Sequence, residues 1–407
     1  KPVELRLCAC SSVIEERSRG PRPMRASLYL ILALTLPRPV SAGEGYPGWE
    51  TDQGCPCSNQ SLCEPIHRVG PERVFAFHVG VAGNKDWTQY DWSQITTVCV
   101  FGALDPELLC HAHRVGARVT IGVDIGIASW RNASLVDAWI AEKVRKVQDG
   151  FLDGLNLDIE DSATDPDDVR ALSSLSARTA EAMHKAVPGS QVTFDVPSGG
   201  MLNQGTCGTQ YNRRYDFGAL AAAMDFLVAM DYDSNAHYPS KCPTCFDANC
   251  GLPILEQGTR CYEKLGVPAS KLVLAMPWYG YDYTCGPDDK PGDICRIQAA
   301  AQISYPGAAG LLLSSSIGGR HWAANTSTPY FYYRDRSSAL HRVDYDDVDS
   351  LRIKYAYART AGHRGVGMWT ANSLNYTNVS EVSSFWEALK EFEPPPGEDD
   401  VANLAYV

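Results

Sequence analysis

Short apolar and β-branched runs recur along most of the chain and alternate with segments of helical period. One such segment, 165–186, opens with Asp165-Pro166 as N-cap and first helical residue and closes before Pro188-Gly189. A second helical period covers 134–147. The apolar runs predict eight buried strands, at 73–79, 95–101, 117–123, 152–160, 191–196, 226–232, 271–277 and 365–370.

Continuous apolar strands that alternate with helices are typical of parallel βα units. Eight such units predict an α/β fold, a closed (β/α)8 TIM barrel. An open, doubly wound sheet is the competing interpretation. It is weakened because no Gly-x-Gly-x-x-Gly follows the first strand.

The spacing of the strands predicts an insertion between the seventh and eighth. Residues 279–345 are rich in Gly, Pro and Tyr and hold short strand-like runs at 310–314 and 330–333, which predicts a small α+β insertion. Asp349-Ser350 is then expected to cap a helix that runs from Leu351 towards Ala361 and stops at Gly362. We expect the barrel domain to cover 43–395, with a tail at 396–407.

The first 42 residues are expected to lie outside the fold. Met24-Arg25, an apolar run at 28–36 and the small-residue pattern Val40-Ser41-Ala42 predict a signal peptide at about 24–42. Residues 1–23 are interpreted as translated upstream sequence. The apolar run is shorter than the roughly 20 residues of a spanning helix, so we expect a mature soluble protein that begins near Gly43 and has no membrane partner.

Charge narrows the choice of partner. The formal net charge is −12, and residues 1–42 carry seven of the 36 basic and three of the 48 acidic residues, so the remainder has a net charge of −16. A nucleic-acid partner is therefore not expected.

Cysteine usage indicates an oxidising compartment. Twelve of the 14 cysteines follow residue 42, an even number that suits disulfides. Cys242-Pro-Thr-Cys245, with Cys250 and Cys261 nearby, could form a zinc knuckle, but the signal peptide favours disulfides. Cys285 and Cys295 flank a short loop and are the best candidates for one bonded pair. The candidate glycosylation sites are Asn59, Asn132, Asn325, Asn375 and Asn378.

The segment 151–161 carries the candidate chemistry. Side chains on a strand alternate between faces, so the apolar Leu155, Leu157 and Ile159 are expected to pack under helices. The alternate residues Asn156, Asp158 and Glu160 are expected to face the barrel interior, at the carboxyl end where such barrels keep their active sites. Repulsion from Asp158 is expected to raise the proton affinity of Glu160 and so suit it to donate a proton.

Two alternatives for this segment remain open. It could be an acidic strand end in solvent, or a divalent-metal site built from Asp153, Asp158 and Glu160. Both are less favoured because the alternation with apolar residues is regular. His-Glu-x-x-His, Gly-x-Ser-x-Gly and P-loop patterns are absent, and no metal or organic cofactor is expected.

The pattern Asp-Gly-x-Asn-x-Asp-x-Glu at 153–160 resembles the signature of the family 18 glycoside hydrolases. Segments 230–233, 276–280 and 367–369 are similar to the family at the sixth, seventh and eighth strands. The resemblance implies retaining, substrate-assisted hydrolysis: Glu160 is the acid and later the base, Asp158 holds the acetamido N–H, and Tyr232 hydrogen-bonds the acetamido oxygen. It implies substrate contacts for Asp153, Asn156, Met230, Asp233, Trp278, Tyr279 and Trp369, with Trp369 as the floor of the sugar subsite.

Some of these assignments have alternatives. Trp278, Tyr279, Tyr281 and Trp369 could instead be core residues. Asp195 is a weaker candidate, an inward polar group that could support the site. Asn156 stands where many family members have Asp, and the loops at 197–213 and 234–262 carry extra Cys and Gly, so they leave the cleavage specificity open.

The resemblance implies an exo-acting enzyme that hydrolyses the β-1,4 bond of N,N'-diacetylchitobiose at the reducing end of free N-glycan-derived oligosaccharides. An endo-acting chitinase or endo-β-N-acetylglucosaminidase is the first alternative. A non-catalytic chitin-binding lectin is the second, and the presence of Glu160 argues against it. We expect a monomer in the lysosome by resemblance, with secretion as the alternative.

Overall fold

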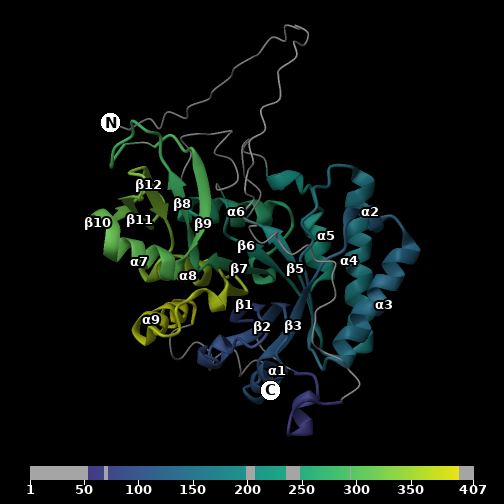
Figure 1. The fold of residues 1–407 in the computed structure, drawn as a ribbon. Coiled ribbons are helices and arrows are strands. Elements are labelled where there is room, and N and C mark those ends of the chain that lie inside the picture. Colours follow the sequence, from purple (N-terminus) through teal and green to yellow (C-terminus); the bar gives the residue numbers. More distant parts are fainter. Residues whose placement is uncertain (1–53, 68–71, 199–206, 235–247, 294, 394–407) are drawn as a thin grey trace, which may run out of the picture. The chain divides into compact units, whose positions relative to one another are not determined.

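The computed structural model (Figure 1) describes residues 54–67, 72–198, 207–234, 248–293 and 295–393. Eight parallel strands close a barrel in the order β1-β13-β7-β6-β5-β4-β3-β2. The predicted barrel is confirmed. Its strands are β1 (Val74–Gly80), β2 (Ile95–Gly102), β3 (Arg118–Val123), β4 (Gly154–Leu157), β5 (Gln191–Pro197), β6 (Phe226–Met230), β7 (Leu272–Pro277) and β13 (Gly365–Trp369).

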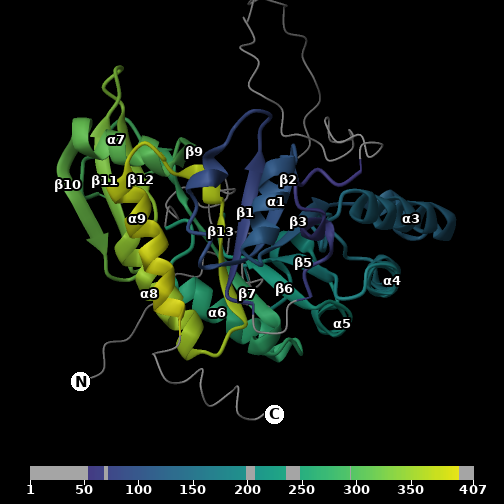
Figure 2. The same ribbon diagram turned by 90° about the horizontal axis from the view of Figure 1, so that it is seen from below.

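Helices surround these strands, and α3 and α4 pack side by side on the flank that Figure 2 shows opposite the second sheet. The predicted start of α4 is confirmed, because the Asp165 carboxylate accepts the N–H of Asp167 and Pro166 is the first helical residue. The helices outside the insertion are α1 (Pro106–Arg114), α2 (Ile127–Trp130), α3 (Ala133–Asp149), α4 (Pro166–Ala186), α5 (Phe217–Ala223), α6 (Leu252–Lys264), α8 (Val348–Thr360) and α9 (Val379–Ala388).

Strand β4 is shorter than predicted and ends at Leu157. The chain stays extended for one more ladder bond, in which the Asp158 N–H donates to the Val123 carbonyl at 2.8 Å. Asp158 and Glu160 therefore lie just past the carboxyl end of β4.

Two apolar layers stabilise the barrel. The larger lies between strands and helices and includes Leu155, Leu157 and Ile159, the set predicted to pack under helices. The smaller fills the barrel and contains the edge-to-face ring pairs that Phe75 forms with Phe77 and Phe226. The polar residues at the carboxyl end of β4 are therefore held by rigid packing on both sides.

A second sheet lies beside the barrel, drawn in green in both ribbon views. Its order is β10-β11-β12-β8-β9, and α7 (Tyr305–Ser315) packs against it. The strands are β8 (Tyr279–Thr284), β9 (Ala299–Ser304), β10 (Ser316–Ala323), β11 (Thr328–Arg334) and β12 (Leu340–Asp344). The strand-like run at 330–333 is a strand, but the one at 310–314 belongs to α7.

The error at 310–314 has a local cause. A short apolar run fits a buried strand and a buried helix equally well. Here the Ser304 hydroxyl accepts the Gly307 N–H and Pro306 occupies the first turn, so the chain starts a helix.

The predicted cap of the next helix is also wrong, by two residues. Helix α8 begins at Val348, and its N-cap is Asp347, whose carboxylate accepts the N–H groups of Asp349 and Ser350. The Ser350 hydroxyl accepts the Asp347 N–H in return, a reciprocal capping box that Asp349-Ser350 could not form. Gly362 follows the helix with φ 71°, as expected of a stop.

Four disulfides are described, and the predicted Cys285–Cys295 pair is one of them. The others are Cys55–Cys63, Cys57–Cys110 and Cys207–Cys261. The pairing of Cys261 argues against its use in a zinc knuckle, while Cys242 and Cys245 lie outside the described residues. No helix within the described ranges is both long and apolar enough to cross a membrane.

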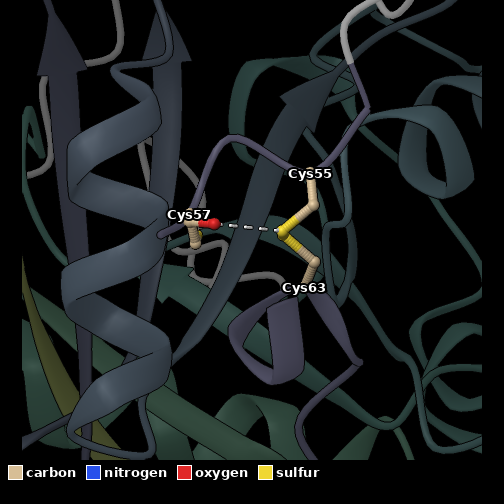
Figure 3. A group of neighbouring side chains, drawn as sticks. All are labelled: Cys55, Cys57 and Cys63. Carbon is tan, nitrogen blue, oxygen red and sulfur yellow. Dashed lines mark hydrogen bonds between the residues drawn. A yellow bond between two sulfur atoms is a disulfide. The ribbon is translucent and has the colours of Figure 1, made fainter. Parts of the chain in front are cut away.

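One cluster of sulfur atoms has the spacing of a metal site. The Sγ atoms of Cys55, Cys57 and Cys63 lie within 4.8 Å of one another, as Figure 3 illustrates. All three sulfurs belong to disulfides, and a disulfide sulfur is not a thiolate ligand. This cluster therefore fastens the N-terminal segment to α1.

Candidate active site

A cavity of about 380 Å³ opens at the carboxyl ends of β4, β5 and β6. A segment that follows β5, with η4 (Gln210–Asn212), forms part of its wall. The lining residues are Glu160, Pro197, Ser198, Tyr211, Arg213, Met230, Tyr232 and Asp233. Four of the predicted site residues are therefore brought together here: Glu160, Met230, Tyr232 and Asp233.

Glu160 projects from the end of β4 into this cavity and meets a cation. Its side chain is 48% exposed, whereas that of Arg213 is 8% exposed. Arg213 donates from Nη2 to the Glu160 carboxylate and from Nε, at 2.9 Å, to the Glu160 carbonyl. The guanidinium therefore fixes both the backbone and the carboxylate of Glu160.

Asp158 lies deeper than Glu160. Burial, followed by the charge of Glu160, raises the pKa of Asp158 to about 8, although the charge of Arg213 opposes the shift. Its Oδ1 is buried and accepts no hydrogen bond from a described residue. The strong upward pKa shift at Asp158, the more buried partner, was not expected from the sequence, and it means that Asp158 retains a proton.

The segment that carries Arg213 is fastened to the segment that carries Glu160. Ala163 and Arg213 form a parallel bridge, and the Arg214 N–H donates to the Ala163 carbonyl at 3.0 Å. The Ser162 hydroxyl donates to the Tyr211 carbonyl at 2.8 Å. These bonds join the backbone at 162–163 to the backbone at 211–214 and so hold the Glu160–Arg213 ion pair in place.

Tyr232 and Trp369 form an aromatic wall beside the acidic pair. Their ring centroids lie 5.9 Å apart at 32°, and Trp369 also contacts the rings of Phe77 and Phe101 inside the barrel. Tyr232 is buried except for the part that lines the cavity. The role of Trp369 as sugar floor stays a prediction, and its half-buried position at the end of β13 suits it.

Asp233 is a carboxylate held by tyrosines. Tyr281 donates its hydroxyl to Asp233 Oδ1 at 2.6 Å, and the Tyr279 hydroxyl donates to the same oxygen. The Asp233 N–H donates to Asn249 Oδ1, and the residue has φ 56°. Tyr279 and Tyr281 are buried, so both support Asp233, while substrate contact by Tyr279 stays a prediction.

Three residues predicted to contact substrate lie elsewhere. Trp278 is fully buried among helix side chains, with its N–H on the Tyr355 hydroxyl at 3.1 Å, because the residue after β7 faces outward. Asp153 precedes β4 and is bonded at the amino end of the barrel. Asn156 is fully buried, two residues before Asp158, and lies beneath the cavity.

Arg213 and Tyr211 line the cavity but were not predicted from the sequence. Both lie in an irregular segment with no periodicity, so no local pattern marks them. A general signal was available, since a carboxylate pair at a strand end needs a cation, and the loop after the neighbouring strand is the nearest source. The guanidinium of Arg213 also packs over the Tyr211 ring at 5.1 Å.

The five candidate glycosylation asparagines are all exposed. Two of them cap α-helices with their side chains: the Asn132 amide oxygen accepts the Leu135 N–H at 3.2 Å, and that of Asn378 accepts the Glu381 N–H. Glycosylation at these five sites stays a prediction.

Comparison with known proteins agrees with this geometry. Residues 128–373 match the family model described as glycosyl hydrolases family 18. The chain belongs to glycosyl hydrolase family 18 and is a glycosidase. A solved chitinase from Cycas revoluta, described in complex with (GlcNAc)3, shares the fold with a TM-score of 0.65 and 15% identity, over 79% of this chain and 100% of that one.

The curated relatives are more specific. Di-N-acetylchitobiase of Mus musculus is 36% identical over 378 residues, which cover 89% of this chain and 97% of the mouse protein. Di-N-acetylchitobiase of Homo sapiens is 35% identical over 353 residues, 83% of this chain and 88% of the human one. The similarity therefore extends over nearly the whole of these relatives.

Proposed function

We propose that this glycosidase hydrolyses the β-1,4 bond of N,N'-diacetylchitobiose at the reducing end of free N-glycan-derived oligosaccharides. The observation that carries the proposal is the pairing of a buried, proton-retaining Asp158 with an accessible Glu160 beside one cavity. The similarity to di-N-acetylchitobiases supports the choice of bond. Exo action is part of the proposal and needs its own test.

Glu160 is assigned as general acid and then base, because it is the accessible carboxyl of the pair. Asp158 takes up the acetamido N–H, and Tyr232 hydrogen-bonds the acetamido oxygen. As Asp158 accepts the acetamido N–H it ionises and passes its proton to Glu160, so the pair shares one proton. The acetamido oxygen then attacks the anomeric carbon and the leaving oxygen takes that proton from Glu160. Water opens the resulting ring and returns a proton to Glu160. Two displacements at one carbon retain the β configuration.

Asp233 is the other carboxylate in the cavity lining and therefore the alternative nucleophile of a two-carboxylate mechanism. Its Oδ1 already accepts two tyrosine hydroxyls. Such hydrogen bonds stabilise the carboxylate and reduce its nucleophilicity. This favours the acetamido oxygen as the nucleophile.

Two digestions test the proposal. With a reducing-end-labelled N-acetylglucosamine oligomer, exo action at the reducing end releases the labelled monosaccharide first, whereas endo action releases labelled oligomers first. With chitobiose that carries a free amine at the cleaved sugar, hydrolysis should fail even though the sugar binds. Efficient hydrolysis of that substrate would show that a protein carboxylate is the nucleophile.

We also propose delivery to the lysosome through the secretory pathway, with secretion as the alternative. The disulfides support passage through an oxidising compartment. Fractionation of expressing cells tests the destination: activity should sediment with lysosomal markers, and its recovery mainly in the medium would favour secretion.

A further inference from the structure

Two polar side chains form a buried pair beneath the catalytic carboxyls. The Asn156 Nδ2 donates to Asp195 Oδ1 at 2.8 Å. Asn156 is 0% exposed and Asp195 is 2% exposed. Asn156 on β4 is paired in register with Thr193 on β5, and Asp195 lies two residues further along the same face of β5.

The surroundings of Asp195 disfavour its ionised form. Burial raises the pKa of Asp195 well above its ordinary value, and the charges of Asp158 and Glu160 raise it further. An ionised Asp195 would place a further negative charge in a region of low dielectric, which is costly without a bonded cation.

Within the described part of the chain, the Asn156 side chain lacks a donor for its amide oxygen. Its Oδ1 is buried and accepts no hydrogen bond from a described residue. A buried amide oxygen of this kind needs a donor, and an ionised carboxylate can only accept. A protonated carboxyl has complementary edges for an amide, because its carbonyl oxygen accepts the N–H and its O–H donates to the amide oxygen.

We propose that Asp195 is kept protonated and forms a two-bond acid–amide pair with Asn156, and that this neutral pair is a positioning element beneath Asp158. The amide N–H donates to one oxygen of Asp195, and the Asp195 O–H donates to the Asn156 amide oxygen. Both partners are neutral and both edges of the amide are satisfied.

The consequence for the reaction rests on the proposed function. Asp158 follows Asn156 by two residues on the same face, so a fixed Asn156 fixes the base of Asp158. Because the Asn156–Asp195 pair is neutral, it places no negative charge beneath Asp158 that would oppose the ionisation of Asp158 when it accepts the acetamido N–H. Asp195 therefore acts through Asn156 and Asp158 and does not touch the substrate.

Infrared spectroscopy tests the protonation directly and uses no substrate. At about pH 9, above the pKa of Asp158, the folded protein should still show the carbonyl band of a buried protonated carboxylic acid. Asp231 is also buried with a strongly raised pKa and can contribute to the band, so the readout is the difference spectrum between the original protein and each variant. Asp195→Asn should remove the intensity of one carboxyl from the band, and Asp158→Asn, the matched control, should leave it unchanged. An unchanged band in Asp195→Asn, with or without a loss in Asp158→Asn, would overturn the proposal.

Kinetics test the positioning role on the same variants. Asp195→Asn keeps a neutral hydrogen-bonding group, so kcat should stay within about fivefold of the original enzyme, the effect of one weakened bond. The alkaline limb of its pH–rate profile should not move. Asp195→Ala leaves both edges of Asn156 unpaired, and its kcat should fall about 10- to 100-fold through misplacement of Asp158.

Two results would contradict this role. If Asp195→Asn lost as much kcat as Asp195→Ala, or if its alkaline limb moved to lower pH, Asp195 would be an ionised group that raises the proton affinity of Asp158. The exchange Asn156→Asp with Asp195→Asn keeps one acid and one amide, and its infrared band should remain. The infrared result stands even if chitobiose proves not to be the substrate.

Discussion

An aspartate with a buried carboxyl oxygen lies at each end of strand β4, and the two aspartates differ in their hydrogen-bond partners. At the amino end, Asp153 accepts the N–H groups of Ile66 and Val119, both at 2.7 Å, and contacts His113 Nε2 at 2.8 Å. At the carboxyl end, Asp158 keeps a buried oxygen with no described partner and retains a proton.

The difference distinguishes structure from function within one strand. A carboxylate with hydrogen bonds to both oxygens holds elements together, here the N-terminal disulfide segment, α1 and β3. A carboxyl whose oxygen is left unpaired costs free energy and persists where a ligand completes it. Each end of β4 also has a basic partner: His113 at the amino end and Arg213 at the carboxyl end. The predictions that follow act on one end or the other.

The largest effect is expected at the exposed carboxyl. Glu160→Gln keeps the shape but removes the transferable proton, so kcat should fall about 10² to 10⁴-fold while the thermal midpoint stays close to that of the original enzyme. Asp161→Asn is the matched control, since Asp161 is adjacent but outside the cavity lining. Near-normal turnover of Glu160→Gln would remove Glu160 from the role of acid.

The two aspartates should respond to the same substitution in opposite ways. Asp153→Asn leaves buried donors facing an NH₂ group and breaks the contact with His113, which should lower the free energy of unfolding by about 3 to 5 kcal/mol. Asp158→Asn relieves like-charge repulsion, so its stability should not fall, although activity should. Urea unfolding of both variants measures the contrast, and equal destabilisation would contradict it.

Substitution of Arg213 tests the role of the cation that pairs with Glu160 at the carboxyl end of β4. Arg213→Ala should lower kcat about tenfold, because Glu160 loses the group that orients it. The charge of Arg213 lowers the pKa of Asp158. Its removal should therefore move the alkaline limb of the pH–rate profile to higher pH. An unchanged profile would mean that Arg213 has a purely structural role.

The smallest effect is expected from the cation at the amino end. Burial lowers the pKa of His113, but the hydrogen bond and charge of Asp153 and the Leu62 carbonyl outweigh it, and the net shift is upward. A raised folded-state pKa gives stability that is complete below the ordinary histidine pKa of about 6.5 and is lost as pH rises through the folded value.

His113→Gln isolates this contribution. The difference in unfolding free energy between the original protein and His113→Gln should shrink as pH rises from about 5 to about 8. Thermal or urea unfolding across that range measures it. A difference that grew with pH would reverse the sign and indicate that His113 is buried in its neutral form.

The barrel could be predicted from the sequence because its signals are local. Apolar runs mark strands, caps such as Asp165-Pro166 mark helix starts, and the alternation in 153–160 marks the catalytic strand whatever surrounds it. The failures were equally local in cause. The run at 310–314 fits helix and strand alike, and the cap at Asp347 depends on a reciprocal bond with Ser350 that the predicted cap at Asp349-Ser350 could not form.

Which carboxyl keeps the proton was decided only by tertiary structure. Asp153, Asp158 and Asp195 are the same residue type, and their roles differ through burial and through partners that lie far away in the sequence: His113 for one, Arg213 for another, Asn156 for the third. Sequence alone therefore determined the fold, the family resemblance and the strand that carries the chemistry. The packed structure determined the charge of each group, because desolvation and Coulomb interactions depend on distances that no local pattern records.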